Sequence, residues 1–164
     1  MLHFVQAYRS LTRILKPDFQ IFKLRELFLS LEQLMADSFR QKSIIFNIET
    51  IPESLELTAD PKLVEQILIN LLKNAMEALE NFPKPNIDLS ASLDPRGRVV
   101  IQVRDNGPGI SEEAQDKIFI PFYTTKKGGS GIGLSLAKQI MRLHKGNISF
   151  ISRPDAGTVF KLTF

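Results

Sequence analysis

Apolar residues recur every three or four positions in four stretches of this chain, the spacing that places them on one face of a helix. The helices predicted from this pattern cover residues 2–15, 24–39, 61–80 and 133–143. Pro17 ends the first of them, because proline pushes the preceding residue out of the helical region, and residues 16–20 are expected to form an extended connector. In the second helix, the side chains expected to face the core are those of Leu24, Leu27, Leu31, Leu34 and Met35.

Alternation of apolar and polar residues predicts strands between and after these helices. Short strands are expected at residues 43–47 and 55–58, around the turn at Pro52. Residues 86–93 and 98–104 are joined by Asp94-Pro-Arg-Gly, in which proline second and glycine fourth suit a type I turn, so they are predicted to form a hairpin. A second hairpin is predicted from residues 147–152 and 158–164, with Phe160, Leu162 and Phe164 on one face.

The third helix has the clearest signals. Asp60 is a favourable cap and Pro61 suits the first helical position. At ~100° per residue, Asn70, Asn74 and Glu77 fall on one sector. The apolar sector beside it is formed by Val64, Ile67, Leu71, Ala75 and Ala78. Polar side chains that border a core face are placed to line a crevice rather than open solvent.

Residues 107–131, here called the lid segment, contain few periodic apolar residues apart from a helical turn expected near residues 111–118. Segments of this length in compact domains are usually functional lids or disordered. We expect the lid segment to be mobile when no ligand is bound.

The composition narrows the class of protein. With 164 residues, 43% hydrophobic and 24% charged, the chain suits one soluble domain with a sizeable core. It has no cysteine, which excludes disulfides and thiolate metal sites. A net charge of +3 is compatible with anionic ligands and does not call for nucleic acid. No apolar run approaches the ~20 residues of a membrane helix, and no signal peptide is visible.

The end of the 98–104 strand carries the first candidate for ligand chemistry. Asp105 leads there into Asn-Gly-Pro-Gly-Ile110. A carboxylate accepts a hydrogen bond from an exocyclic amine such as that of adenine, and glycines let a ring approach the backbone. The alternative is a tight turn after a strand, since this stretch is rich in turn residues.

Asn70 and Asn74 are one helical turn apart, so their amide oxygens can converge on one point. Magnesium takes hard oxygen ligands and needs only one or two from the protein when phosphates and water supply the others. Glu77, on the same side, could orient a water or a ligand. The alternative is that both asparagines are solvated or hydrogen-bond to nearby backbone.

A glycine-rich stretch, Gly129-Ser-Gly131-Ile-Gly133-Leu134, opens the fourth helix. Helix N-termini offer unpaired amide donors and partial positive charge to phosphates. Neither a dinucleotide fold nor a P-loop fits, because no parallel βαβ unit is expected around this stretch and it lacks the Gly-Lys-Ser/Thr ending. Lys126 and Lys127 lie just upstream and could reach phosphate oxygens or remain solvated.

The remaining candidates are less specific. Phe119 and Phe122 could anchor a moving loop, although core packing is the more ordinary role for Phe119. Thr158 follows Gly157 into the last strand, where its hydroxyl could serve an adenine ring or simply belong to a turn. His3 and His144 lack a motif and are expected to be surface or packing residues.

Taken in order, these stretches resemble the catalytic and ATP-binding domain of sensor histidine kinases, which have the Bergerat ATP-binding fold. Asn70-Leu-Leu-Lys-Asn74-Ala-Met-Glu77-Ala is similar to the N box, and Asp105-Asn-Gly-Pro-Gly109 to the G1 box. Phe119-Ile-Pro-Phe122-Tyr-Thr-Thr-Lys126 resembles the F box. Gly129 to Leu134 resembles the G2 box, and Gly157-Thr158 the last glycine box. The match covers residues 22–164.

The resemblance implies an α/β fold, a two-layer sandwich whose mixed, mostly antiparallel sheet is covered on one face by helices. It implies that ATP is bound with Mg²⁺, that Asp105 binds the adenine amine and that Thr158 supports the ring. Asn70 and Asn74 would hold the metal and, with Lys126, take part in catalysis. The nucleotide contacts implied come from Lys73, Glu77, Asp105, Gly107, Gly109, Ile110, Phe122, Thr125, Gly129, Gly131, Ile132, Gly133, Leu134 and Thr158.

One departure from the family matters. Such kinases carry the acceptor histidine in an H box on a dimerisation helix, and neither His3-Phe-Val nor His144-Lys-Gly resembles one. Residues 1–21 instead resemble the end of a dimerisation helix with its linker. We therefore expect a piece of a larger homodimeric kinase that phosphorylates its own dimerisation domain and then a response regulator, without a nucleic acid partner. The piece would be a cytoplasmic domain, and any membrane-spanning part would lie outside this chain.

Two other functions are compatible with the same motifs. An anti-sigma-factor serine kinase has the same ATP fold but a protein serine as acceptor, and the helix predicted over residues 2–15 argues against it. An ATP-gated module without kinase activity, as in chaperone or repair ATPases, is disfavoured by the F box.

Overall fold

The structure of the protein is a computed structural model that describes Val5, Arg9 and residues 16–164. The helix predicted over residues 2–15 lies outside the described residues, apart from those two positions. Residues 16–19 form the expected connector, with neither helix nor strand, and lead into β1 (Gln20–Lys23).

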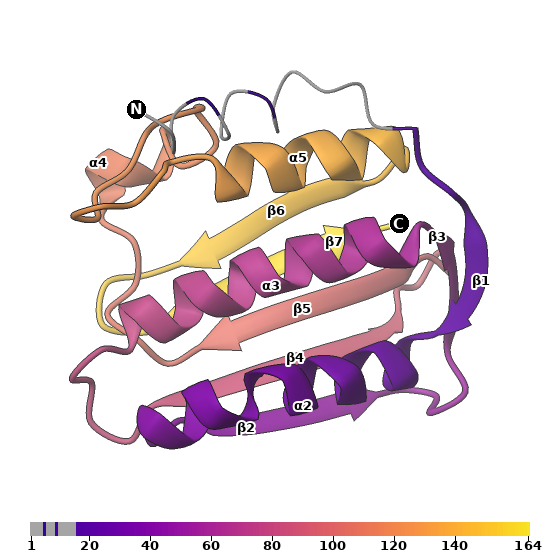
Figure 1. Ribbon diagram of the computed structural model, residues 1–164, viewed down its shortest axis with the longest axis horizontal. Coiled ribbons are helices and arrows are strands. Elements are labelled where there is room, and N and C mark those ends of the chain that lie inside the picture. The colour runs from indigo at the N-terminus through magenta and orange to yellow at the C-terminus, as the bar shows by residue number, and fades with distance from the viewer. Residues whose placement is uncertain (1–4, 6–8, 10–15) are drawn as a thin grey trace.

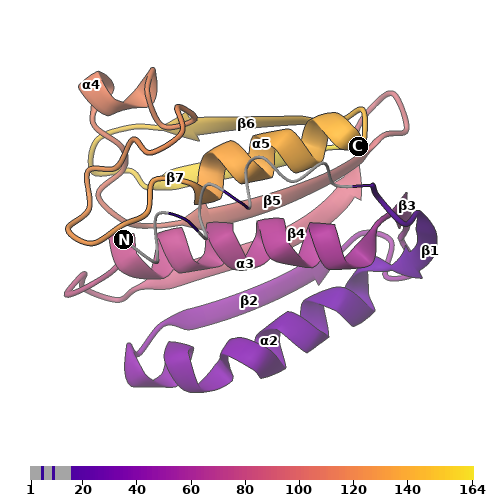
Figure 2. The ribbon, with the colours of Figure 1, turned by 45° about the horizontal axis from the view of Figure 1, so that its top comes forward.

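Helices α2 (Leu24–Gln41), α3 (Pro61–Ala78) and α5 (Gly133–Leu143) lie side by side over one face of a five-stranded sheet (Figure 1). The sheet contains β2 (Ile45–Thr50), β4 (Asn86–Leu93), β5 (Val99–Asp105), β6 (Asn147–Ser152) and β7 (Thr158–Thr163). Its order is β2-β4-β5-β7-β6, and only the β2–β4 pair is parallel. In the tilted view the three helices again lie on the same face of the sheet (Figure 2). The predicted two-layer α/β sandwich is confirmed.

The two predicted hairpins are present, as β4–β5 and β6–β7. The hairpin strands β5 and β7 are also hydrogen-bonded neighbours, with Asp105 opposite Thr158 in the register. Two residues that lie 53 positions apart in sequence therefore sit side by side at the same edge of the sheet. This juxtaposition positions one end of the site described below.

A second, two-stranded sheet lies at one end of the sandwich, where β1 pairs antiparallel with β3 (Glu56–Ala59) (Figure 1). The short strands predicted at residues 43–47 and 55–58 thus belong to different sheets. β1 was not predicted, because four residues between a connector and a helix show no periodicity of their own. Pairing with β3 stabilises β1, and local sequence does not report such a contact.

The prediction for α2 was wrong at one position. Leu24, Leu31 and Met35 are buried as expected, whereas the side chain of Leu34 is 64% exposed. Phe28 and Phe39 are buried against the core in its place. The helix has more apolar residues than one face can hold, and the stacking of Phe39 on Phe46 of β2 shows which face packs on the sheet.

α3 occupies the centre of the helix layer and is apolar over a wide face. Its buried residues are Val64, Ile67, Leu68, Leu71, Leu72, Ala75 and Met76. The predicted start is confirmed: the Asp60 carboxylate accepts hydrogen bonds from the backbone N–H groups of Lys62 and Leu63. None of the described helices combines the length and the apolar character needed to cross a bilayer.

His144, at the end of α5, has the packing role expected of it. Its Nε2 accepts a hydrogen bond from the Asp60 N–H at 3.0 Å, and its Nδ1 lies 2.8 Å from the Ile140 carbonyl oxygen. Asp60 also accepts the N–H of Asp18 from the connector. The cap of α3, the end of α5 and the connector are therefore joined at one point.

Candidate functional site

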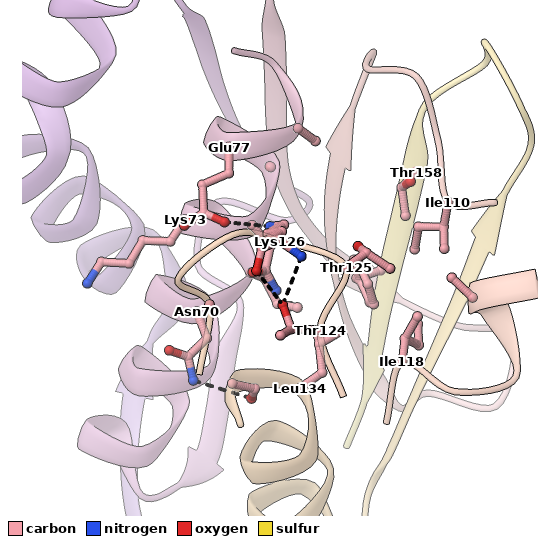
Figure 3. A pocket seen from close by; sticks show the side chains of 18 of the residues that line it. Asn70, Lys73, Glu77, Ile110, Ile118, Thr124, Thr125, Lys126, Leu134 and Thr158 are labelled. Carbon is pink, nitrogen blue, oxygen red and sulfur yellow. Dashed lines mark hydrogen bonds and ion pairs between the residues drawn. The ribbon is translucent and has the colours of Figure 1, made fainter. Parts of the chain in front are cut away.

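A cavity of about 680 Å³ lies between α3, the start of α5, the lid segment and the ends of β5 and β7. Figure 3 shows Thr158 and Ile110 together on one side of it, facing Asn70 and Glu77 of α3 across the space. A volume of this size suits a small organic ligand. Of the residues predicted from the sequence to contact the nucleotide or metal, those lining the cavity are Asn70, Lys73, Asn74, Glu77, Asp105, Gly109, Ile110, Thr125, Lys126, Gly129, Gly131, Ile132, Gly133, Leu134 and Thr158.

Asp105 is the buried carboxylate of the cavity, with only 6% of its surface exposed. Burial raises the pKa of this carboxyl above its ordinary value, although the N–H groups of Gly107 and Thr158 and the charge of Lys126 oppose the shift. The Gly107 N–H donates to Oδ1 at 2.9 Å. Oδ1 therefore has a partner within the chain, and the carboxylate retains acceptor capacity for a ligand donor.

Thr158 stands beside this carboxylate and is 5% exposed. Its Oγ1 is 2.9 Å from the Oγ of Ser152, the last residue of β6. One end of the cavity therefore presents a carboxylate and a hydroxyl side by side. The apolar side chains of Val103, Ile110, Ile118 and Phe160 also line the cavity. Such a combination suits a flat, partly polar ring such as a nucleobase.

The α3 side of the cavity carries the polar residues predicted from the helix periodicity. The Lys126 ammonium reaches from the lid segment to the Glu77 carboxylate at 2.5 Å and to Asn74 Oδ1 at 3.4 Å (Figure 3). Asn70 donates from Nδ2 to the Gly133 carbonyl oxygen at 3.4 Å. Asn74 Oδ1 and the Glu77 carboxylate of α3 thus already hold the Lys126 ammonium group inside the cavity.

The start of α5 forms another wall. Its N-cap position, Ile132, provides no side-chain hydrogen bond to the first turn, and that turn contains no acidic residue. α3, by contrast, is capped by Asp60. An uncapped N-terminus of an eleven-residue helix that faces a cavity offers free N–H groups and partial positive charge to an anion.

Gly131 brings this wall close to the rest of the lid segment. It has a φ of +67°, and a Cβ there would meet the Phe122 Cα at 2.7 Å. The Phe122 N–H in turn donates to the Gly131 carbonyl oxygen at 2.8 Å. Glycine is therefore required at position 131 by both conformation and space.

Two of the predicted contact residues do not line the cavity. Gly107 lies behind it, where its N–H holds Asp105, and Phe122 packs along the backbone of Gly131. Lys73 lines the cavity, but Figure 3 shows its ammonium directed away from Lys126. Phe119 packs against the core and under the Lys138 ammonium, 5.2 Å from its ring centroid.

Several residues of the site were not predicted. Pro108, Ser111, Ala114, Ile118, Tyr123, Thr124 and Ser130 line the cavity. They belong to the lid segment, so their region was predicted but not their individual contacts. Ser152 is different, because a serine at the end of a strand carries no local signal. The only sequence indication that Ser152 belongs to the site was the predicted hairpin, which places it opposite Thr158.

Comparison with known proteins places this geometry in context. The family model "Histidine kinase-, DNA gyrase B-, and HSP90-like ATPase" matches residues 59–164. The C4-dicarboxylate transport sensor protein DctS of Rhodobacter capsulatus is 42% identical over 106 residues, which are 64% of this chain and 16% of that protein. The signal transduction histidine-protein kinase AtoS of Escherichia coli (strain K12) is 38% identical over 122 residues, 74% of this chain and 20% of that protein. The chain thus matches a fifth or less of the length of these relatives.

Solved structures agree with the sequence relatives. A catalytic domain of histidine kinase ThkA superimposes with a TM-score of 0.80 at 38% identity, covering 90% of this chain and 95% of that one. ThkA in complex with the response regulator protein TrrA matches with a TM-score of 0.82 at 32% identity, covering 98% of this chain and 46% of that one.

Proposed function

Because this chain belongs to the family of histidine kinase-, DNA gyrase B- and HSP90-like ATPases and is an ATP-binding histidine kinase catalytic domain, we propose that its cavity delivers the γ-phosphoryl group of ATP to a histidine on another domain. The observation that carries this proposal is the polarity of the cavity. A buried carboxylate lies at one end and an uncapped helix N-terminus with a cation-holding pair of side chains lies at the other. ATP has the matching order of groups, an amine-bearing base followed by phosphates.

At the base end, Asp105 accepts the exocyclic amine of adenine. Its carboxylate has no proton to donate, so a base with a carbonyl oxygen at that position would face repulsion instead. Thr158 supplies a hydroxyl to the same edge of the base, and Gly109 and Ile110 lie along the ring.

At the phosphate end, Gly129, Gly131, Gly133 and Leu134 bring the backbone of the α5 N-terminus to the phosphate chain. Lys126 and Thr125 approach the phosphates from the lid segment. Phosphoryl transfer depends mainly on positioning and on neutralising charge, and backbone N–H groups and a lysine perform both tasks.

Magnesium fits the residues on α3. Lys126 already places a positive charge against Asn74 Oδ1 and Glu77, so these oxygens favour a cation. Asn74 and Asn70 would hold the metal, together with phosphate oxygens and water, and Glu77 would orient a coordinated water. When bound, the ion neutralises phosphate charge.

The rest of the phosphorylation system is proposed from this assignment. By their sequence resemblance, residues 1–21 are assigned to the end of the dimerisation domain with its linker, and residues 22–164 to the catalytic and ATP-binding domain. The parent protein is a cytoplasmic or membrane-anchored homodimer whose dimerisation domain carries the acceptor histidine, and a response regulator receives the phosphoryl group.

Incubation with γ-labelled ATP tests this function, and the expected product is an acid-labile phosphohistidine on that dimerisation domain. An acid-stable phosphoserine on a partner protein would favour the anti-sigma-factor type, and absence of any transfer would favour the ATP-gated module.

Asn74→Ala tests the metal assignment. We expect its Kd for Mg-ATP to rise about tenfold, while the Kd for adenosine changes less than twofold, because the lost amide oxygen contacts the metal and not the base. Calorimetric titrations with adenosine, and with ATP with and without Mg²⁺, provide the measurement. Asn147→Ala, at an exposed position at the start of β6, is the matched control. Equal losses for adenosine and Mg-ATP would assign Asn74 a structural role.

A further inference from the structure

Ser152 is the centre of a hydrogen-bond cluster behind the Asp105 end of the cavity. Its Oγ accepts the Ile110 N–H at 2.7 Å, lies 2.9 Å from Thr158 Oγ1 and is 3.2 Å from the Gly157 carbonyl oxygen. Ser152 itself does not line the cavity, whereas Ile110 and Thr158 do, and both appear side by side in Figure 3. One hydroxyl group thus connects the loop after β5 with β7.

Neighbouring contacts leave this loop little freedom. Gln115 of α4 (Glu112–Gln115) donates from Nε2 to the Ile110 carbonyl oxygen at 3.0 Å. A Cβ on Gly109 would meet the Arg153 carbonyl oxygen at 2.3 Å and Ser152 Oγ at 3.2 Å. The Asp155 N–H donates to the Pro108 carbonyl oxygen at 2.9 Å. The loop that follows Asp105 is therefore seated on the β6–β7 turn, with Ser152 at the centre of the contact.

The protons of the cluster determine what Thr158 can offer a ligand. The Ile110 N–H occupies one acceptor position of Ser152 Oγ, and the single Ser152 proton goes either to Gly157 or to Thr158. When Ser152 donates to Thr158, the Thr158 proton is free to point into the cavity. When Ser152 donates to Gly157, Thr158 donates to Ser152 and presents only lone pairs. In either case the Thr158 oxygen is held in one rotamer.

We propose that Ser152 is a positioning residue for adenine recognition, which acts by holding the Thr158 hydroxyl and the Ile110 backbone next to Asp105. The proposal rests on the function proposed above, since it assumes that the Asp105 end receives the base. The Ser152 hydroxyl holds the Thr158 oxygen beside Asp105. When Ser152 donates to Thr158, the Thr158 proton is available to a ring nitrogen of the base while Asp105 accepts the amine.

Single substitutions test this role through binding. Ser152→Ala is expected to raise the Kd for ADP about five- to tenfold, the effect of losing one or two oriented hydrogen bonds. The increase should be equal for adenosine and for Mg-ATP, because Ser152 acts at the base end. Ser149→Ala, at an exposed position on the same strand, should bind like the wild type. An unchanged Kd in a folded Ser152→Ala variant would overturn the proposal.

A double-mutant cycle distinguishes positioning from general support of the fold. In a Thr158→Val background, which removes the hydroxyl that Ser152 holds, Ser152→Ala should cost clearly less than it does in the wild type, because only the support of the Ile110 backbone remains to be lost. Additive losses would show that Ser152 does not act through Thr158. If Ser152→Ala fails to fold, the isosteric pair Ser152→Thr and Ser152→Val replaces it, and only the Thr variant should bind within about threefold of the wild type. Absence of adenine nucleotide binding by the wild type would instead refute the proposed function.

Discussion

An Asp105→Ala variant is expected to lose about 100-fold in affinity for ATP while its fold survives. The exocyclic amine of adenine would enter a closed end of the cavity and find no acceptor, which costs roughly 2–3 kcal/mol for a charged partner. At 1.4 kcal/mol per tenfold change in Kd, this penalty corresponds to the expected loss. Isothermal calorimetry with ATP and Mg²⁺ measures it, with circular dichroism and thermal melting as checks of the fold.

Two further variants sharpen this test. Asp88→Ala removes a carboxylate from neighbouring β4, where Asp88 hydrogen-bonds to Asn47, and should leave ATP binding unchanged. Asp105→Asn should bind ATP as weakly as Asp105→Ala, because the Gly107 N–H selects the amide oxygen and turns the amide nitrogen toward the base. That variant should instead gain affinity for ITP, which has a carbonyl oxygen in place of the amine. Undiminished ATP affinity in Asp105→Ala would remove Asp105 from the base site.

The buried carboxylate also gives the sign of a pH effect. Burial raises the pKa of Asp105, so this group contributes most to the free energy of unfolding at low pH, and that contribution is lost as the pH rises through the raised pKa. The stability of Asp105→Ala relative to the wild type should therefore increase as the pH rises from about 4 toward neutrality. ATP affinity should show the opposite dependence, since the ionised carboxylate is the better acceptor, and should fall with decreasing pH before an ordinary aspartate would titrate.

The sequence predicted most of the site because its motifs act locally. A cap, a proline and a long apolar face define α3, so the sector holding Asn70, Asn74 and Glu77 followed from helix geometry. The glycine-rich stretch is informative for a similar reason, because a positive φ such as that of Gly131 requires glycine. Such features depend on neighbours in sequence and can be recognised without a structure.

The errors and omissions depend on contacts between distant residues. α2 has apolar residues on more than one face, and its packing against β2 leaves Leu34 exposed while Phe39 is buried. β1 forms only because β3 lies beside it. Ser152 and Ile110 are 42 positions apart, and their hydrogen bond results from the strand order. Supporting residues of this kind require the structure, whereas many of the residues that line the cavity were predicted from the sequence.

The second large effect concerns phosphoryl transfer. The isolated chain should bind ATP and yet place no phosphoryl group on its own His144. Both ring nitrogens of His144 are engaged, Nε2 by the Asp60 N–H and Nδ1 by the Ile140 carbonyl. The residue also follows the last turn of α5, whose first residue, Gly133, lines the cavity. Eleven helical residues span about 16 Å, far beyond the ~3–3.5 Å separation of reacting atoms that in-line transfer requires.

Incubation of the chain with γ-labelled ATP and Mg²⁺ tests this expectation, and acid-labile label is the readout. His3 lies outside the described residues, and its sequence context does not resemble an H box, so it too is expected to stay unlabelled. Calorimetry on the same sample establishes that ATP is bound, which separates a missing acceptor from an inactive preparation. Label that disappears on His3→Gln or His144→Gln substitution would show that the chain carries its own acceptor. We expect label to form only when a dimerisation domain with an H box is joined to residue 1, because no described histidine can approach the phosphates. That result would show that the acceptor comes from outside the cavity-bearing domain.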